Sequence, residues 1–505
     1  MNHGSAQPSG TRRATPLFLI GVGLAFAFEL YGLFFPGRAS FRRYPLAVPD
    51  PFTDLPALRP LVPLAILIAG CLLLALAVRM LPSLAARPWR TTIGLFALGL
   101  SLHFAMIGSL QGGFQAFHRR ALFSGHREFL YASVWARDLP DTLRHYEAFV
   151  QGRTFLLNKG PGITVVYHTL RVIANAGPVK PLIEPLSLPA SVIESWTAEQ
   201  GMSFPSGQID ELRHLLGLMF VVFPVLTYLP IFLLFWLGRT LADDVLGLLA
   251  ATLYLFVPSV GLLVAHLDTA LFPLLVCAVM TLFAIGVRRR SLLFVTASAA
   301  VFTFYFTITL AAAALAAFFL PYLGMVCWSR RRQGDAAVRV AADVLKVCGV
   351  FAGVVVALLL LVSIGFRLDL VERYRVARTI QAGWTTSEYN FFWARADALG
   401  WFLSFGLAQS LLLVAQEGRS LWRVVTAAFD AVDEVALGWL GLLGGLLVLG
   451  RQHGETNRMW TFLAPIACLV LARLLHDKLP ARRYTVPLCL FLAGLVLTRY
   501  RLSYF

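Results

Sequence analysis

The sequence predicts an all-α fold, a polytopic transmembrane helical bundle of about 13 spans. Two observations lead to this prediction. Hydrophobic residues make up 58% of the 505 residues, charged residues only 14%, and the mean hydropathy is +0.72. A soluble domain usually carries about 25% charged residues, so a chain this apolar needs lipid around it. In addition, apolar runs of about twenty residues, the length that crosses a bilayer as a helix, recur along the whole chain.

The candidate spans follow one another from one end of the chain to the other. They are residues 16–36, 62–80, 91–110, 212–238, 245–264, 268–287, 291–306, 308–328, 343–366, 396–415, 434–450, 458–474 and 485–500. The stretch 291–328 contains no charged residue and is too long for one helix, so it predicts two short ones. The polar segment 1–15 precedes an apolar run without a small-residue cleavage site, which predicts a retained first span and not a cleaved signal.

The charge balance fits a membrane protein better than a nucleic-acid-binding one. The net charge is +16, with 43 Lys and Arg against 27 Asp and Glu. The basic residues lie between the apolar runs, as the positive-inside rule expects, and no basic, aromatic-interleaved soluble module is present. The six cysteines lie in or beside apolar runs and have no ligand spacing, which argues against disulfides and zinc sites. Walker A, dinucleotide-binding and zinc-protease motifs are absent.

Basic pairs and triplets predict the orientation of the chain. If every span is real, one side of the membrane holds Arg12/Arg13, Arg87/Arg90, Arg288–Arg290, Arg330–Arg332 and Arg482/Arg483. This side is expected to be cytoplasmic, and the N-terminus lies on it. The other, extracytoplasmic side then holds the long segment 111–211, the turn 266–268 and the loops 367–395 and 451–457. Within the long segment, the amphipathic stretches 126–137 and 163–175 are expected to lie in the membrane interface.

The first candidate for chemistry is Glu128, in the segment His126-Arg127-Glu128-Phe-Leu-Tyr131-Ala132. A carboxylate at a lipid boundary can have a raised pKa and act as a general base. The simpler interpretation is an interfacial helix whose charges are solvated. Glu29, inside the first span, is a lesser candidate because an acid in a membrane is expensive and often functional.

Two turns on the same side are the next candidates. The Gly-Pro-Gly turn after Lys159 lets backbone approach a ligand closely, and Lys159 is placed to meet a phosphate, although such turns are common. His266 and Asp268 form an ionisable pair at a membrane boundary, which is costly unless it is used or solvated. The alternative for Asp268 is a helix cap.

Two further segments combine charge with aromatic residues. The loop after Arg373 contains Arg378, Glu388 and Tyr389, and arginine beside aromatics suits recognition of anionic sugar or phosphate groups. Its alternative is an aromatic belt at the interface. Glu455 and Arg458 open a later span at i,i+3 spacing and are able to pair there, or simply to cap the helix.

Taken in order, these segments resemble the GT-C superfamily of integral membrane glycosyltransferases. Glu128-Phe-Leu-Tyr131-Ala132 resembles an Asp/Glu-x-x-Tyr-Ala pattern, and Lys159-Gly-Pro-Gly162 lies where a His-Pro-Pro-Gly-like turn is found. The segment from Pro258 to Asp268 resembles a Pro…Asp turn. Gly454-Glu-Thr-Asn-Arg-Met-Trp460 is similar to a Gly-Glu-x-x-Arg-x-Trp segment of bacterial members. The resemblance covers roughly residues 91–475.

The resemblance implies a division of the chain into three parts and a chemical role for each candidate. Residues 1–90 are a tail with a two-span extension, 91–366 a core module, and 367–505 an outer loop with the C-terminal spans. The donor would be a sugar on a polyprenyl phosphate, and the acceptor an envelope lipid, glycan or protein. Transfer would occur on the outer face of the cell membrane, with inversion at the anomeric carbon.

The implied catalytic residues are Glu128, as base, and Asp268. Lys159, Arg378 and Arg458 would stabilise the leaving phosphate. Asp268, with His266, would orient the donor or hold a divalent cation such as Mg or Mn, a cofactor that the resemblance leaves open. The remaining implied substrate-binding residues are His126, Tyr131, Glu388 and Glu455.

Two departures from the family pattern keep other functions open. Arg127 stands where the first acid of the usual acidic pair is found, and Lys-Gly replaces His-Pro in the turn. Altered donor recognition is one consequence, and a glycosyltransferase-like scaffold without activity is another. A transporter or flippase of lipid-linked precursors is the third alternative, which predicts inverted halves with broken helices near the membrane midplane.

Overall fold

The computed structural model describes residues 16, 18–27, 61–108, 113–123, 127–157, 159–262, 266–384, 391–449 and 460–501. Within these ranges the chain forms helices and no strands, which confirms the predicted all-α class. In the same ranges, seven helices or helix pairs are long and apolar enough to cross a bilayer. They are Pro88–Gly108, Ser206–Leu241, Leu267–Arg289, Ala311–Arg332, Ala337–Phe366, Ala431–Val448 and Ala481–Thr498.

An eighth candidate span, broken or re-entrant, is a sharply bent helix pair. Asp397–Phe405 and Leu407–Val425 pass the same test together but are bent by 110° at Gly406. The glycine has φ +105°, a conformation that L side chains rarely adopt. Gln409 secures the bend, since its side-chain amide donates to the Phe256 carbonyl at 3.0 Å.

Several predicted spans form helices that are shorter than expected. Among the described residues, apolar helices of 10–17 residues are Phe18–Ala27, Leu64–Arg79, Gly162–Ala174, Asp244–Leu255 and Leu292–Ile308. Proline explains one of them: the predicted span 245–264 ends early at Leu255 because Pro258 opens a separate short helix. The uncharged stretch 291–328 does divide into two helices, as predicted, with Thr309 in extended backbone between them.

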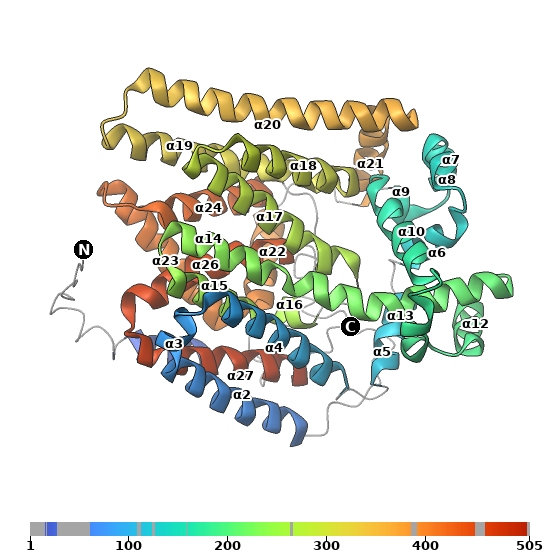
Figure 1. Ribbon diagram of the computed structural model, residues 1–505, viewed down its shortest axis with the longest axis horizontal. Coiled ribbons are helices and arrows are strands. Elements are labelled where there is room, and N and C mark those ends of the chain that lie inside the picture. Colours follow the sequence, from blue (N-terminus) through green and yellow to red (C-terminus); the bar gives the residue numbers. More distant parts are fainter. Residues whose placement is uncertain are drawn as a thin grey trace.

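The long helices run between two chemically different ends (Figure 1). One, the arginine end, lies at the left of Figure 1 and holds α3 (Leu81–Ala85), η5 (Ala481–Arg483) and the turns at Arg288–Arg290 and Arg330–Arg332. The other, the polar end, lies at the right. It holds α5 (Phe114–Phe123), α6 (Arg127–Trp135), α7 (Leu139–Arg144), α8 (Tyr146–Val150), α9 (Thr154–Leu157), α10 (Gly162–Ala174), α11 (Lys180–Ile183), η2 (Glu184–Leu186), α12 (Ala190–Glu199) and α21 (Leu370–Trp384).

The helices between the two ends make up the bundle. They are α2 (Leu61–Arg79), α4 (Pro88–Gly108), α13 (Ser206–Tyr228), α14 (Pro230–Leu241), α15 (Asp244–Leu255), α16 (Pro258–Leu262), α17 (Leu267–Arg289), α18 (Leu292–Ile308), η3 (Leu310–Leu315), α19 (Ala316–Arg332), α20 (Ala337–Phe366), α22 (Phe391–Phe405), α23 (Leu407–Val425), α24 (Ala431–Leu449), η4 (Thr461–Leu463), α26 (Ala464–Lys478) and α27 (Thr485–Arg501). Helix α17 lies at the centre and is buried along most of its length.

Helix α20 shows that the surroundings of the bundle must be apolar. It has 30 residues, yet only Val340 and Val347 are buried within the protein. Leu345, Leu361 and other large apolar side chains of α20 are exposed. An unbroken apolar surface of this size is unstable in water but stable against lipid. The chain is therefore a membrane-embedded helical protein.

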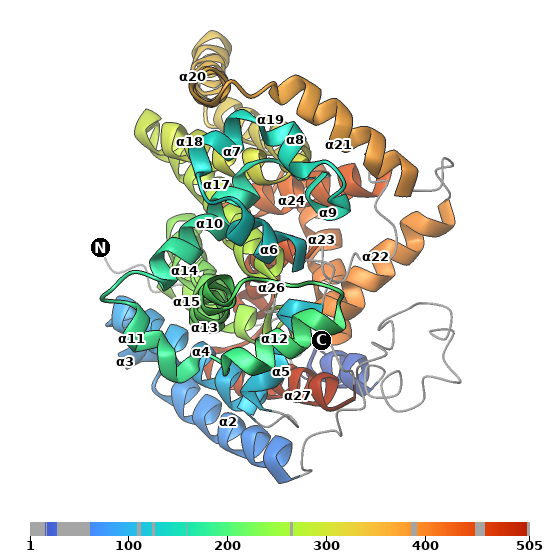
Figure 2. The same cartoon turned by 90° about the vertical axis from the view of Figure 1, so that its right-hand side faces the viewer.

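The polar end is a packed layer of short helices and not an open loop (Figure 2). Helix α10 was expected to lie in the interface with its apolar face in lipid. Instead, its apolar residues Ile163 and Tyr167 are buried against protein, and α10 packs on α6 and α13. An ion pair between Arg171 and Glu211, 2.7 Å long, holds α10 to α13, and Arg137 also binds Glu211. Tertiary packing, which periodicity alone does not reveal, decides where this amphipathic face goes.

Candidate functional site

Glu128 lies at the partly exposed start of an otherwise buried helix. It occupies the first turn of α6, where a carboxylate is stabilised by the helix dipole. Phe129 to Val134, which follow, are all buried. The Glu128 Oε2 atom accepts a hydrogen bond from the backbone N–H of Leu156 at 3.4 Å. Helix α6 therefore presents this carboxylate to the segment that leads to Lys159.

Lys159 lies directly beyond the same residue. Its backbone N–H donates to the Leu156 carbonyl at 3.1 Å, and the residue is only 8% exposed. Leu156 thus binds Glu128 through its N–H and Lys159 through its carbonyl. The carboxylate of Glu128 and the backbone of Lys159 therefore contact the same residue of α9.

The Gly-Pro-Gly turn is fixed by the end of α18. The Gly160 N–H donates to the Ile308 carbonyl at 3.1 Å, and a Cβ added at Gly160 would collide with the Thr307 carbonyl. A Cβ at Gly162 would lie 2.6 Å from the Thr307 Oγ1 atom. The sequence predicted that this turn allows a close backbone approach; the partner in the structure is the C-terminal turn of α18.

Tyr167 lies between Asp268 and the region around Glu128. His266 precedes α17 in extended conformation, and Asp268 follows in the first turn with 6% of its surface exposed. The Tyr167 hydroxyl of α10 lies near the start of α17, where the Leu267 backbone and the charge of Asp268 both act on it electrostatically. The Tyr167 ring stacks on Phe129, with 6.0 Å between ring centroids. Tyr167 therefore connects the start of α17 to the residue next to Glu128.

Two arginines that the sequence did not single out as site residues lie near the same turn. Arg373 of α21 is 2% exposed; one nitrogen donates to the Leu157 carbonyl and another to Glu147 Oε2 at 3.0 Å. Arg153 lies over the rings of Trp135 and Phe149, at 4.7 and 4.6 Å from their centroids. Neither position has a local signature, because their partners are distant in sequence or lie on other helices.

Electrostatics at the turn follow from partial burial. Burial raises the pKa of Glu147, and the neighbouring Arg373 opposes this rise. Burial also lowers the pKa of Arg153, while the charge of Glu128 acts in the other direction. Arg153 and Glu128 thus influence one another, so a carboxylate and a guanidinium share one half-buried environment. Such perturbed groups gather at functional sites more often than elsewhere.

Several predicted site residues do not join this cluster. The Tyr131 hydroxyl donates to Gln200 Oε1 at 3.0 Å and its ring packs on Phe204, so it points towards α12. Burial raises the pKa of Tyr131 to about 12. Arg378 is exposed on α21, one to two turns beyond Arg373. Four other predicted substrate-binding residues, and Glu29, lie outside the described residues: His126, Glu388, Glu455 and Arg458.

The site offers little that would hold a divalent cation. Within the described ranges, no three His, Cys, Asp or Glu side chains come together as metal ligands. Asp268 and His266 are adjacent, but two residues do not complete a Mg or Mn site.

The comparisons with known proteins add no name to this site. No protein-family model matches the chain, and no curated protein is significantly similar to it.

Proposed function

We propose that the protein is a membrane glycosyltransferase that moves a sugar from a polyprenyl-phosphate donor to an envelope lipid, glycan or protein. The observation that supports this proposal is that the Glu128 carboxylate and the Lys159 backbone both contact Leu156, while Tyr167 lies between Phe129 and the start of α17, which carries Asp268. A base, a cation for an anionic leaving group and a second acid are the groups that such a transfer requires.

In the proposed reaction, an acceptor hydroxyl attacks the anomeric carbon of the donor. Glu128 takes the hydroxyl proton as the new carbon–oxygen bond forms. The bond between the anomeric carbon and the phosphate oxygen breaks in the same step, and polyprenyl phosphate leaves with the electron pair. One displacement inverts the anomeric centre.

The cations act on the leaving group. Arg153 and Lys159, which precede and follow Leu156 in the chain, would supply this positive charge, since preorganised charge stabilises a departing phosphate. Arg373 is bound to Glu147 and to the turn, so its role is to position the turn. Asp268, held by α17 and close to Tyr167, would orient the sugar.

The membrane arrangement follows from this placement. We infer that the arginine end faces the cytoplasm, with the N-terminus on that side, and that the polar end is extracytoplasmic. The short apolar helices other than α10 would then bring the number of crossings close to the predicted 13, in a GT-C-like fold. The polyprenyl tail would lie in lipid along the bundle, with its phosphate at the polar end.

The direct test is Glu128→Gln in the full-length protein. Membrane fractions would be supplied with a labelled polyprenyl-phosphate sugar, and transfer of label would be measured. We expect the initial rate to fall by about 10²-fold or more, because a general base contributes about that much. Glu199→Gln, an exposed acid on α12, is the matched control and should transfer at the wild-type rate. Unchanged transfer in Glu128→Gln removes this residue as the base.

One observation favours a transporter or flippase as the second candidate. The 110° break at Gly406 resembles the discontinuous helices of transporters, which form sites inside the membrane. The same labelled donor distinguishes the two functions. A flippase moves intact donor across vesicle membranes without releasing polyprenyl phosphate, whereas the transferase releases it. An inactive scaffold does neither.

A further inference from the structure

An apolar pocket lies on the side of the bundle, away from the cluster around Glu128 and Asp268. It is formed by α2, α4, α15 and α27, and it encloses about 920 Å³ including its open side. Its lining is almost entirely aliphatic and includes Leu73, Ala77, Leu95, Leu249, Leu488 and Leu492. Leu73 is also 53% exposed, so the pocket opens to the outer surface of the bundle. In a membrane, that surface faces acyl chains.

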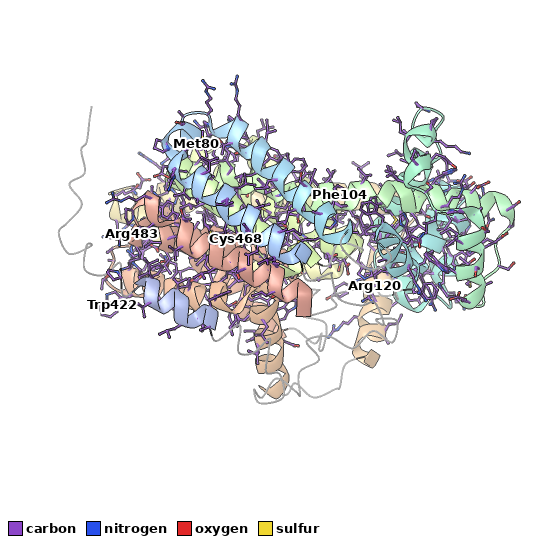
Figure 3. All side chains as sticks on the ribbon, turned by 90° about the horizontal axis from the view of Figure 1, so that it is seen from below. Met80, Phe104, Arg120, Trp422, Cys468 and Arg483 are labelled. Carbon is purple, nitrogen blue, oxygen red and sulfur yellow. The ribbon has the colours of Figure 1, made fainter. Side chains whose placement is uncertain are left out.

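One end of the pocket is surrounded by arginines. Five of them, which we call the basic rim, lie within a few residues of lining positions: Arg79, Arg87, Arg90, Arg482 and Arg483. Leu81 and Leu84 line the pocket between Arg79 and Arg87, and Tyr484 lines it directly after Arg483. Figure 3 shows Met80, the neighbour of Arg79, and Arg483 at the same end of the molecule.

The basic rim has no balancing charge within the part of the chain that the structure describes. All five arginines are exposed, and no described carboxylate forms an ion pair with any of them. The nearby acids are already bound: Asp244 to Arg239, Asp243 to His476, and Asp477 to Arg419. Other arginines of this end differ, since Arg330 is neutralised by Asp335 and Asp343. The described carboxylates therefore leave the positive charge of the rim available to an anion.

We propose that the pocket and the basic rim bind one anionic phospholipid. An acyl chain enters the apolar pocket, and the phosphate lies on the arginines of the rim. The pocket and the rim match the two parts of such a lipid. The aliphatic cavity is open to the membrane, where the acyl chains lie, and it continues into uncompensated positive charge at the height of the headgroups. Trp89, 47% exposed beside Arg90, marks that height, since tryptophan collects at the interface.

The test compares retention of two lipids by the purified full-length protein. The protein would be stripped of lipid in detergent and incubated with equal amounts of phosphatidylglycerol and phosphatidylcholine, and the bound lipid counted by mass spectrometry. We expect wild type to retain phosphatidylglycerol in preference. Arg482→Gln/Arg483→Gln should lower this preference by about tenfold or more. Arg289→Gln/Arg332→Gln, at the same end but away from the pocket, should keep it.

A second variant tests the pocket without touching the rim. Ala77→Phe fills the cavity and should lower phosphatidylglycerol retention while all five arginines remain; Ala77→Leu serves if the larger residue gives aggregated protein. Inorganic phosphate alone should not displace the lipid. The proposal is overturned if wild type retains both lipids equally or if inorganic phosphate displaces the lipid. It is also overturned if the Arg289/Arg332 control loses as much preference as the Arg482/Arg483 variant, or if the pocket variant retains phosphatidylglycerol undiminished.

Discussion

The Glu128 carboxylate accepts a hydrogen bond from the backbone N–H of Leu156, while the Leu156 carbonyl binds the Lys159 N–H. The first bond is 3.4 Å long, which is weak for a charge-assisted contact. The Glu128 carboxylate is therefore held beside α9, next to the segment that leads to Lys159. This relationship makes the geometry of the turn the decisive feature of the site.

The turn itself depends on the close approach of Gly160 to α18. Gly160→Ala introduces a Cβ against the Thr307 carbonyl, and the backbone must move. We expect a loss of about 1–3 kcal/mol in stability, typical of overpacking, together with loss of transfer. Thermal unfolding in detergent and the labelled-donor assay would measure both.

Gly207→Ala is the control for this change. A Cβ at Gly207, near the start of α13, meets nothing within 4 Å. Alanine there should be neutral or slightly stabilising, because it favours a helix. If Gly160→Ala behaves like Gly207→Ala in both measurements, the turn does not need its contact with α18.

Arg373 is expected to hold the turn from the other side. Arg373→Gln removes the bonds to Glu147 and the Leu157 carbonyl. Because Glu147 is 47% exposed at its side chain, we expect a loss of about 2 kcal/mol and not the full cost of breaking a buried pair. Local opening should then make the amides of residues 146–160 exchange hydrogen roughly tenfold faster.

Two variants sharpen this result. Arg373→Lys keeps the charge but cannot reproduce the two-armed geometry, so it should restore little protection. Arg375→Gln breaks only an exposed pair with Glu372 and should leave exchange unchanged. Equal exchange in Arg373→Gln and Arg375→Gln would show that Arg373 does not position the turn.

The ion pairs of His476, at the arginine end, should make the stability of the protein depend on pH. Hydrogen bonds from His476 to Asp243 and Asp477 raise the pKa of His476 from 6.5 to about 9. The stabilisation is therefore complete below about pH 6.5 and is lost as the pH rises through 9. The melting temperature of the wild-type protein should fall across this window.

His476→Gln should remove the part of this pH dependence that comes from the ion pairs. Its melting temperature should be lower than that of wild type at pH 6.5, and the two should converge at pH 9. His145→Gln, which changes an exposed ring on α7–α8, should follow the wild-type curve. A difference between His476→Gln and wild type that stays constant with pH would contradict the assignment.

The sequence was a good guide to the fold class and a poorer one to helix length and packing. Hydropathy predicted a helical membrane bundle, and charge patterning placed Glu128, Lys159 and Asp268 at one end of it, where the structure has them. The length of α15 was overestimated because Phe256 and Val257 are apolar although Pro258 already ends the helix.

Long-range contacts explain what could not be predicted. Arg373 acts on residues more than 200 positions away, at Leu157 and Glu147, and nothing near Arg373 indicates this. In the same way, the apolar face of α10 docks on α6 and α13 although an identical pattern would suit a lipid interface. Tyr167, the link between α10 and α17, appeared only as one more apolar-face residue.

The central claim is that Glu128 and Asp268 serve one reacting centre. Its most direct test is a double-mutant cycle of Glu128→Gln and Asp268→Asn, read as the rate of sugar transfer from a labelled polyprenyl phosphate. Residues that act as a unit are strongly non-additive. We predict that each single variant loses most of the rate and that the double variant is about as slow as the slower single one. Losses that multiply, or single variants that transfer at the wild-type rate, would contradict a shared site.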